Sequence, residues 1–247
     1  MPKDYFSGHS QVYASFRPTY PEDLYAFIFQ HVAQKDTAWD CATGNGQVAW
    51  YLAEYFDRVF ATDISVQQLE QAPAHDGLVY AMSPAERTLF PDNHFDLITV
   101  GQALHWFDRS AFYTEVKRVA KPGAILAVWG YATMSITPEI DGPLLHFYST
   151  IVGPYWDEAR RLVEQQYKTI EFPFDEIPAP SFAIRVAWSL EHLAGYLESW
   201  SATQKYIREK GTNPVPDLIK TLAPLWPDEV QHTVSFPVFL RLGRVVK

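Results

Sequence analysis

The fold is decided by one short stretch of the chain, Asp40-Cys41-Ala42-Thr43-Gly44-Asn45-Gly46-Gln47-Val48-Ala49. It separates a strand-like segment, residues 37–41, from a helical one, residues 46–55. Gly44 and Gly46 allow a sharp turn and let a ligand approach the backbone without a Cβ in the way. The helix that follows presents unpaired N–H groups to polar or anionic atoms.

A second acidic residue stands where a nucleoside-containing cofactor needs it. The next predicted strand, residues 58–62, ends at Asp63, about 20 residues past the glycines, where a carboxylate accepts both hydroxyls of a ribose. Asp40 lies at the tip of the preceding strand, with its carboxylate expected to face the loop. Many strand-to-helix turns carry glycines and bind nothing, but the two acids together favour a cofactor site.

Composition excludes several classes of partner. The chain has 247 residues, 47% of them apolar, and a formal net charge of -9 without a long basic run. We therefore expect no nucleic acid and no membrane as partners. The absence of a signal-peptide core and the single Cys41, which rules out an internal disulfide, predict a cytoplasmic protein. No His/Cys cluster has metal-ligand spacing, so no metal is expected.

Strands and helices alternate through the first half of the chain. The pattern predicts strands over 37–41, 58–62, 78–82, 95–100 and 124–129, and helices over 21–33, 46–55, 110–119 and briefly from residue 66. This alternation is typical of an α/β fold, here a doubly wound, mostly parallel sheet with helices on both faces.

The pattern changes after Trp129. Helix is predicted over 132–168 and 190–209, and strands over 170–174, 182–188 and 234–246, with Pro237 marking a break or an edge in the last. The simplest arrangement is a helical cap over the C-terminal edge of the sheet. Four regions follow: 1–35, an N-terminal lid and first helix; 36–131, the cofactor-binding core; 132–233, the cap and acceptor-binding elements with further strands; and 234–247, the final strand.

Further motifs surround the glycine loop. They read YASFRPTYP at 13–21, FDLI at 95–98, QALHWF at 102–107, KPG at 121–123 and LESWS at 197–201. In this order they make the chain resemble class I S-adenosylmethionine-dependent methyltransferases, and among these the trans-aconitate methyltransferase-like small-molecule group. The resemblance covers residues 5–130 well and the cap more loosely.

The resemblance implies a Rossmann-like core that transfers a methyl group from S-adenosylmethionine to a small-molecule acceptor, with O-methylation of a carboxylic acid as one candidate reaction. Residues 5–20 correspond to a lid that orders over the cofactor, and the protein is expected as a monomer or homodimer. The implied cofactor-binding residues are Tyr13, Arg17, Asp40, Gly44, Gly46, Asp63, Ile64, Ser83, Ala85, Glu86 and Gln102. The implied acceptor-binding residues are Tyr20, His105, Trp106, Tyr131 and Trp200.

One position departs from the family pattern. Members often carry an acid before Ala-Glu after the third strand, and that acid accepts a hydrogen bond from the adenine amine. Here Pro84 stands in its place, and proline has neither a side-chain acceptor nor an N–H. Ser83, Glu86 or a backbone carbonyl would have to take over this contact.

Two roles are open for His105, the histidine that the motif places next to the expected methyl group. It is either a general base or a residue that only contacts the acceptor or cofactor. A carboxylate acceptor is already nucleophilic and needs no base, whereas a hydroxyl, amine or carbon acceptor does. A carboxylate does need a cation or donors, and the candidates in the cap are Arg160, Arg161, Arg185, Lys205 and Arg208.

Two other functions fit parts of the sequence. Gly44-x-Gly46-x-x-Ala49 with Asp63 also matches an NAD(P)-dependent oxidoreductase, although Asp40 would repel a bound pyrophosphate. A non-catalytic protein that binds S-adenosylmethionine is the third alternative.

Overall fold

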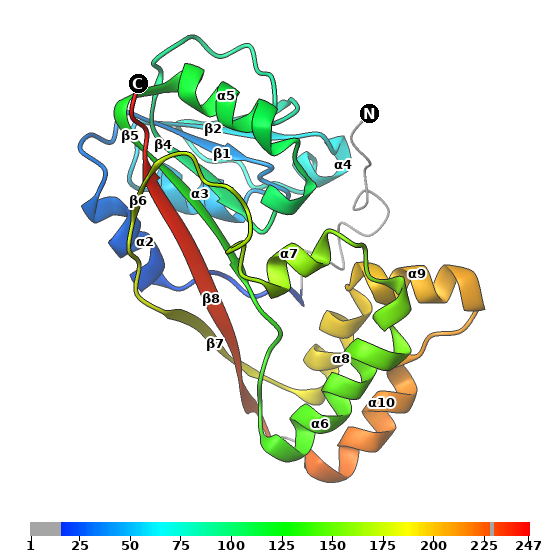
Figure 1. Ribbon diagram of the computed structural model, residues 1–247. Helices are drawn as coiled ribbons and strands as arrows, with labels where there is room; N and C mark the ends of the chain where they lie inside the picture. Colours follow the sequence, from blue (N-terminus) through cyan, green and yellow to red (C-terminus); the bar gives the residue numbers. More distant parts are fainter. Residues whose placement is uncertain (1–15, 228–229) are drawn as a thin grey trace.

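The computed structural model describes residues 16–227 and 230–247. Tyr13 and most of the expected lid, residues 5–15, lie outside this part. The described strands form one eight-stranded sheet in the order β3-β2-β1-β4-β5-β8-β6, and β7 pairs with β8 outside this path. Figure 1 shows the long β8 beside β5.

The strands divide into a parallel and an antiparallel group. The parallel strands are β1 (Thr37–Cys41), β2 (Arg58–Asp63), β3 (Leu78–Met82), β4 (Phe95–Gly101) and β5 (Ala120–Tyr131). The antiparallel strands are β6 (Asp175–Ile177), β7 (Phe182–Trp188) and β8 (His232–Arg244).

The helices follow the strands. The α-helices are α2 (Glu22–Gln30), α3 (Gln47–Ala53), α4 (Val66–Leu69), α5 (Arg109–Val119), α6 (Pro138–His146), α7 (Arg160–Glu164), α8 (Leu190–Glu198), α9 (Ser201–Lys210) and α10 (Val215–Leu222). Shorter turns are η2 (Leu104–Trp106), η3 (Phe147–Ile151), η4 (Gly153–Tyr155) and η5 (Ala223–Leu225).

Two apolar layers sandwich the parallel strands. Neighbouring residues of β1 point to opposite faces, so that Ala38 packs in the layer of α2 and α3 while Trp39 packs in the layer of α5. Leu97 and Ile98 of β4 divide in the same way. Because both faces are covered, β4 is buried along almost its whole length. The predicted doubly wound, mostly parallel α/β sheet is confirmed.

A helical cap stands beside this core. Helices α8, α9 and α10 pack together, and α6 packs on α10. Figure 1 shows them gathered away from α5 and the parallel strands, with α7 between the two bodies. Helix α7 also packs against η2, which follows β4. In the described residues no helix combines the length and the apolar character needed to cross a bilayer.

Both long helices predicted in the cap are interrupted. The 132–168 segment contains α6, two short turns and α7 instead of one helix, with Pro143 inside α6 and Pro154 in η4. The 190–209 segment ends α8 at Glu198, because the Ser199 hydroxyl donates to the Tyr196 carbonyl and Trp200 takes an extended backbone. This break directs the Trp200 ring into the cap interior, where it is 5% exposed.

Two predictions for the last strands also need correction. Residues 170–174 are irregular, because Phe172 and Phe174 pack their rings on Tyr113 while the chain pairs with β8 only from Asp175 onward. Pro237 does not break β8. The Pro237 carbonyl accepts from the Ala132 N–H, which follows the last residue of β5. The carbonyl and the nitrogen of a strand residue point to the same side, so the Pro237 nitrogen faces the β5 side and not β7. The missing N–H therefore costs no hydrogen bond to β7.

Candidate functional site

The glycine loop joins β1 to α3 in a conformation that needs its glycines. Gly44 and Gly46 have φ values of 58° and 81°, in the left-handed region. A Cβ on Gly46 would overlap the Tyr80 ring, whereas one on Gly44 would meet only Gln68 Oε1 at 3.9 Å. Gly46 is therefore required both by its left-handed backbone conformation and by the lack of room for a Cβ. The side of the loop at Gly44 stays open to a ligand.

Asp63 connects this loop to the end of β2. Its Oδ2 accepts from the Gly44 N–H at 2.8 Å, and its Oδ1 accepts from the Ser65 N–H at 2.8 Å. The Thr43 N–H donates to the Thr62 carbonyl nearby. The sequence-predicted residues Gly44, Gly46 and Asp63 thus come together at the C-terminal edge of the parallel strands.

Asp40 is buried beneath the same loop. Its Oδ1 accepts from the Thr99 hydroxyl of β4 at 2.7 Å, and its Oδ2 accepts from the Thr43 hydroxyl. Burial raises the pKa of Asp40 to about 6, although the two hydroxyls and the Ala49 N–H stabilise the charged form. Both oxygens are therefore engaged in holding the loop against its neighbours.

The loop region also contains a buried acceptor without a partner. Gln68 Oε1, on α4, makes no hydrogen bond with any described residue although it is shielded from solvent. It faces the open side of Gly44. A cofactor rich in N–H and O–H groups fits such a place, because a donor from the ligand would satisfy the amide oxygen.

The residues expected near an adenine do not point to one common site. The Ser83 hydroxyl donates to the Pro84 carbonyl, and Ala85 is buried in the α5 layer. Glu86 accepts from the backbone N–H of Asp108, the residue that caps α5. Ile64 follows Asp63 with its side chain 38% exposed. The adenine contact itself stays a prediction.

His105 lies in η2 with its ring almost fully buried. Its Nδ1 is 2.7 Å from the hydroxyl of Tyr167, a residue 62 positions later in the chain. Burial, together with the nearby positive charge of Arg160, lowers the pKa of His105 to about 3, and the charge of Asp157 opposes this shift. The imidazole is therefore neutral at physiological pH.

The hydrogen bond also indicates which ring nitrogen carries the proton. In the described residues no other acceptor is available for the Tyr167 hydroxyl proton, so we assign this hydroxyl as the donor to Nδ1 and the proton of the neutral imidazole to Nε2. Tyr167 has a φ of 56° and is fully buried. Its carbonyl accepts from Arg241, which also binds Glu176. Tyr167 is thus firmly held.

Arg17 connects the N-terminal segment to both bodies of the protein. Its Nη1 donates to the Tyr131 hydroxyl of β5 at 2.7 Å, and its Nη2 reaches the Ser199 carbonyl at 3.4 Å. The guanidinium lies 5.2 Å from the centre of the Tyr196 ring of α8. Tyr20 packs edge-on against Trp129.

Gln102 ties the ends of β4 and β5 together. Its side-chain amide donates to the Tyr131 carbonyl at 3.2 Å and accepts from the Tyr131 N–H at 3.3 Å. Its backbone has a φ of 58°. The expected cofactor residues Arg17 and Gln102 therefore meet at Tyr131, which was expected to contact the acceptor.

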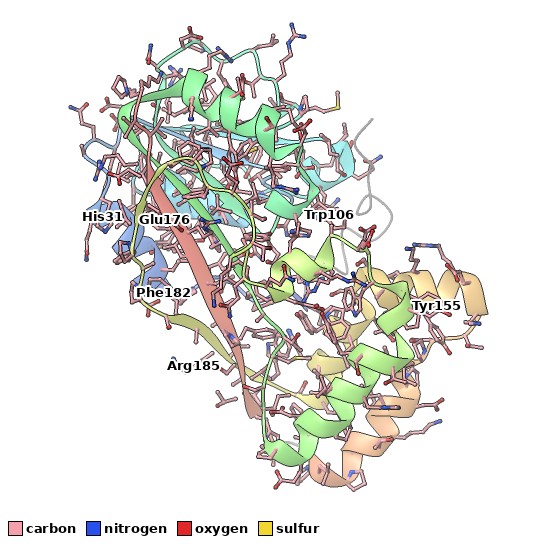
Figure 2. All side chains as sticks on the ribbon, viewed as in Figure 1. His31, Trp106, Tyr155, Glu176, Phe182 and Arg185 are labelled. Atoms are coloured by element: carbon pink, nitrogen blue, oxygen red, sulfur yellow. The ribbon has the colours of Figure 1, made fainter. Side chains whose placement is uncertain are left out.

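An aromatic cluster fills the side of the cap next to α7. The Trp200 ring centre lies 5.4 Å from that of Trp156 and 5.6 Å from that of Tyr148. Trp106 packs on His105 with ring centres 4.6 Å apart. Figure 2 shows Trp106 on the side of the core that faces α7. Of the expected acceptor residues, Trp106 and His105 thus lie on the core and Trp200 on the cap.

The comparisons with known proteins agree on one family. A family model described as a methyltransferase domain matches residues 39–128. A Dictyostelium discoideum protein assigned as a methyltransferase is 33% identical over 98% of this chain and 95% of its own length. A solved structure from Anaeromyxobacter dehalogenans, assigned as a type II methyltransferase, is 36% identical, covers 94% of this chain and 99% of that one, and has a TM-score of 0.87.

The chain belongs to the methyltransferase family. It is an S-adenosylmethionine-dependent enzyme, which decides against the NAD(P)-dependent oxidoreductase and the non-catalytic alternative. A methyltransferase of Aspergillus candidus is a more distant relative, 29% identical over 68% of this chain and 61% of its own length. In residues 16–227 and 230–247 of this methyltransferase, no three His, Cys, Asp or Glu side chains gather as a metal site.

Several contacts of the site had no signal in the sequence. Thr99 holds Asp40 from another strand, Tyr167 holds His105, and Gln68 faces the loop from α4. Thr43 was the one partner with a local signal, since it lies within the glycine motif itself and hydrogen-bonds the acid that begins it.

The raised pKa of Asp40 predicts a specific loss of stability with rising pH. The folded-state pKa of about 6 exceeds the ordinary value of 3.8, so the proton stabilises the fold below pH 4 and this contribution disappears as pH rises through 6. Urea unfolding of the wild type and Asp40→Asn should show their difference in unfolding free energy changing by roughly 2 kcal/mol between pH 4 and 7. Asp57→Asn, at an exposed acid, should run parallel to the wild type, and a parallel Asp40→Asn curve would contradict the argument.

Proposed function

We propose that this methyltransferase transfers a methyl group from S-adenosylmethionine to a small-molecule carboxylic acid, methylated on oxygen between the core and the aromatic cap. The acceptor class is inferred from the state of His105, which is buried, neutral and hydrogen-bonded through Nδ1. The resemblance to the trans-aconitate methyltransferase-like group supports the same class.

The glycine loop and Asp63 are the proposed cofactor-binding surface. Bound S-adenosylmethionine supplies an electrophilic methyl on a sulfonium, so the protein has to provide position and a dry pocket. Asp63 would accept the ribose hydroxyls while it keeps the Gly44 N–H in place. Gln68 Oε1 would receive a donor on the open side of Gly44. Ser83, Glu86 and Ile64 remain the candidates on the adenine side.

His105 is proposed as a hydrogen-bond donor to the acceptor or cofactor and not as a base. A group whose conjugate acid has a pKa of about 3 removes protons poorly at neutral pH. The Tyr167 hydroxyl occupies Nδ1, and Nε2 carries the proton. A hydroxyl or amine acceptor would need a stronger base, whereas a carboxylate is already deprotonated.

Screening tests the reaction directly. The purified enzyme is incubated with methyl-labelled S-adenosylmethionine and a panel of small acids, phenols, amines, proteins and nucleic acids. Labelled methyl esters of one or more acids are the expected products. Label found only in protein or nucleic acid would refute the small-molecule acceptor, and label in a phenol or amine would refute the carboxylic acid.

Asp63→Ala should weaken cofactor binding by roughly 2–4 kcal/mol, because two charge-assisted hydrogen bonds to the ribose are lost. Isothermal titration with S-adenosylhomocysteine measures the effect. Asp57→Ala removes an exposed acid that precedes the first residue of β2, and this control should bind S-adenosylhomocysteine as the wild type does. Equal affinity of wild type and Asp63→Ala would mean that the ribose lies elsewhere.

His105→Asn should retain turnover within about tenfold of the wild type and raise KM for the acid, since a contact is lost and no base is removed. The wild-type kcat should stay flat from about pH 7 to 8.5, above the Asp40 pKa of about 6, because His105 does not titrate there. A fall in kcat of roughly 10²–10⁴, with a wild-type limb near pH 6.5 that His105→Asn lacks, would instead identify His105 as a general base.

Tyr167→Phe keeps the ring and removes only the hydroxyl that holds Nδ1. We expect the His105 proton to distribute over both nitrogens, which two-bond 1H–15N NMR of the imidazole resolves. The wild type should show the Nε2-protonated form alone. A wild type already protonated on Nδ1 would overturn the proposed donor role.

A further inference from the structure

One guanidinium of the cap lies between the core and the aromatic cluster. Arg160 is the first residue of α7, and Figure 1 shows this helix between the parallel strands and the cap helices. Its Cζ is 5.0 Å from the Trp156 ring centre and 5.9 Å from that of Tyr148. Its Nε donates to the Tyr148 hydroxyl at 3.2 Å. These contacts fix the plane of the guanidinium.

The charge of Arg160 is not neutralised by an acid. In the described part of the chain no carboxylate forms an ion pair with it, and its Nη1 and Nη2 make no hydrogen bond. Glu164 accepts from the Tyr148 hydroxyl and so reaches Arg160 only through the phenol. The Asp157 carboxylate accepts from the Ala159 N–H. Neither terminal nitrogen is shielded from solvent, so both are accessible to an anion.

The position of this charge links it to the transfer site. Arg160 lowers the pKa of His105 on the core and opposes the rise in the pKa values of Tyr148 and Tyr196 on the cap. Its charge therefore acts on residues of both the core and the cap, and the helix that Arg160 begins packs against η2, which carries His105. The histidine expected beside the methyl group lies within the field of this charge.

The other basic candidates of the cap are placed differently. Arg161 is 76% exposed and lies 4.0 Å from Glu158, and Arg208 is exposed near the end of α9. Figure 2 shows Arg185 on β7, far from α7 and Trp106. No aromatic ring of residues 16–227 or 230–247 lies beneath the Lys205 ammonium to orient it. Among these five, and within the described residues, Arg160 is the one that lies over aromatic rings, and its charge also acts on His105.

We propose that Arg160 binds a carboxylate of the methyl acceptor end-on through Nη1 and Nη2, and so determines that the enzyme accepts anionic substrates. The proposal rests on the methyl transfer to a small acid proposed above. Because Trp156 and Tyr148 hold the planar group by its face and by Nε, the two remaining amino groups form a fork that matches a carboxylate. A lysine would keep the charge but lose this geometry.

The test compares Arg160→Met, Arg160→Lys and the matched exposed control Arg161→Met. Binding of S-adenosylhomocysteine is measured first by isothermal titration, and then succinate, glutarate and citrate are titrated into the loaded protein beside their neutral amides. We expect equal cofactor affinity in all four proteins. Arg160→Met should bind the acids about 10- to 100-fold more weakly, Arg160→Lys should be intermediate, and Arg161→Met should match the wild type.

The same variants are then assayed for methyl transfer to whichever acid the labelled screen identifies. A raised KM in Arg160→Met with little change in kcat would support anchoring. Equal acid binding in Arg160→Met and wild type would overturn the role of Arg160 and leave the proposed function intact. A wild type that methylates neutral acceptors only would overturn the carboxylic acid acceptor, and the role of Arg160 with it. A wild type that neither binds S-adenosylhomocysteine nor labels any small molecule would instead overturn the proposed function, and this inference with it.

A thermal melting temperature equal to that of the wild type excludes misfolding of Arg160→Met, and Arg160→Lys provides the second readout.

Discussion

The buried carboxylate of Asp40 is the interaction on which the rest of the site depends. It joins the loop through Thr43, strand β4 through Thr99 and helix α3 through the Ala49 N–H. Burying a carboxylate is unfavourable unless hydrogen-bond donors surround it. Here the donors come from the loop, β4 and α3, so the carboxylate holds these three elements together. The loop then has one conformation, in which the side of Gly44 is open and the Gly44 N–H donates to Asp63.

Charge is distributed across the site in a way that suits methyl transfer between ions. The loop side carries the carboxylates of Asp40 and Asp63, the middle carries a neutral histidine, and the cap side carries Arg160. In the proposed reaction a sulfonium and a carboxylate give two neutral groups, so a pocket that disfavours separated charge would favour the products. Under this proposal a protonated histidine near the acceptor would compete with Arg160 for the carboxylate, and the low pKa of His105 keeps the imidazole neutral.

The sequence predicted what depends on neighbours along the chain. Strands 37–41 and 78–82 have their predicted bounds, and Gly44, Gly46 and Asp63 meet as expected. It could not predict contacts that only the folded chain creates, such as Tyr167 on His105, or the selection of Arg160 among five basic residues. The continuous apolar stripe of 190–209 also hid the break at Trp200, because a stripe of side chains persists when two helices meet at an angle.

The break at Trp200 has consequences beyond helix geometry. By ending α8, it leaves the Ser199 carbonyl unpaired within the helix, and Arg17 donates to this carbonyl while it also binds Tyr131 on β5. The same break places the Trp200 ring against Trp156, which supports Arg160. The position of the cap on the core and the orientation of the guanidinium therefore depend on one interruption of the helix. An uninterrupted helix, which the apolar pattern alone would favour, would remove both, so the departure from the simple pattern lies where the acceptor is expected to bind.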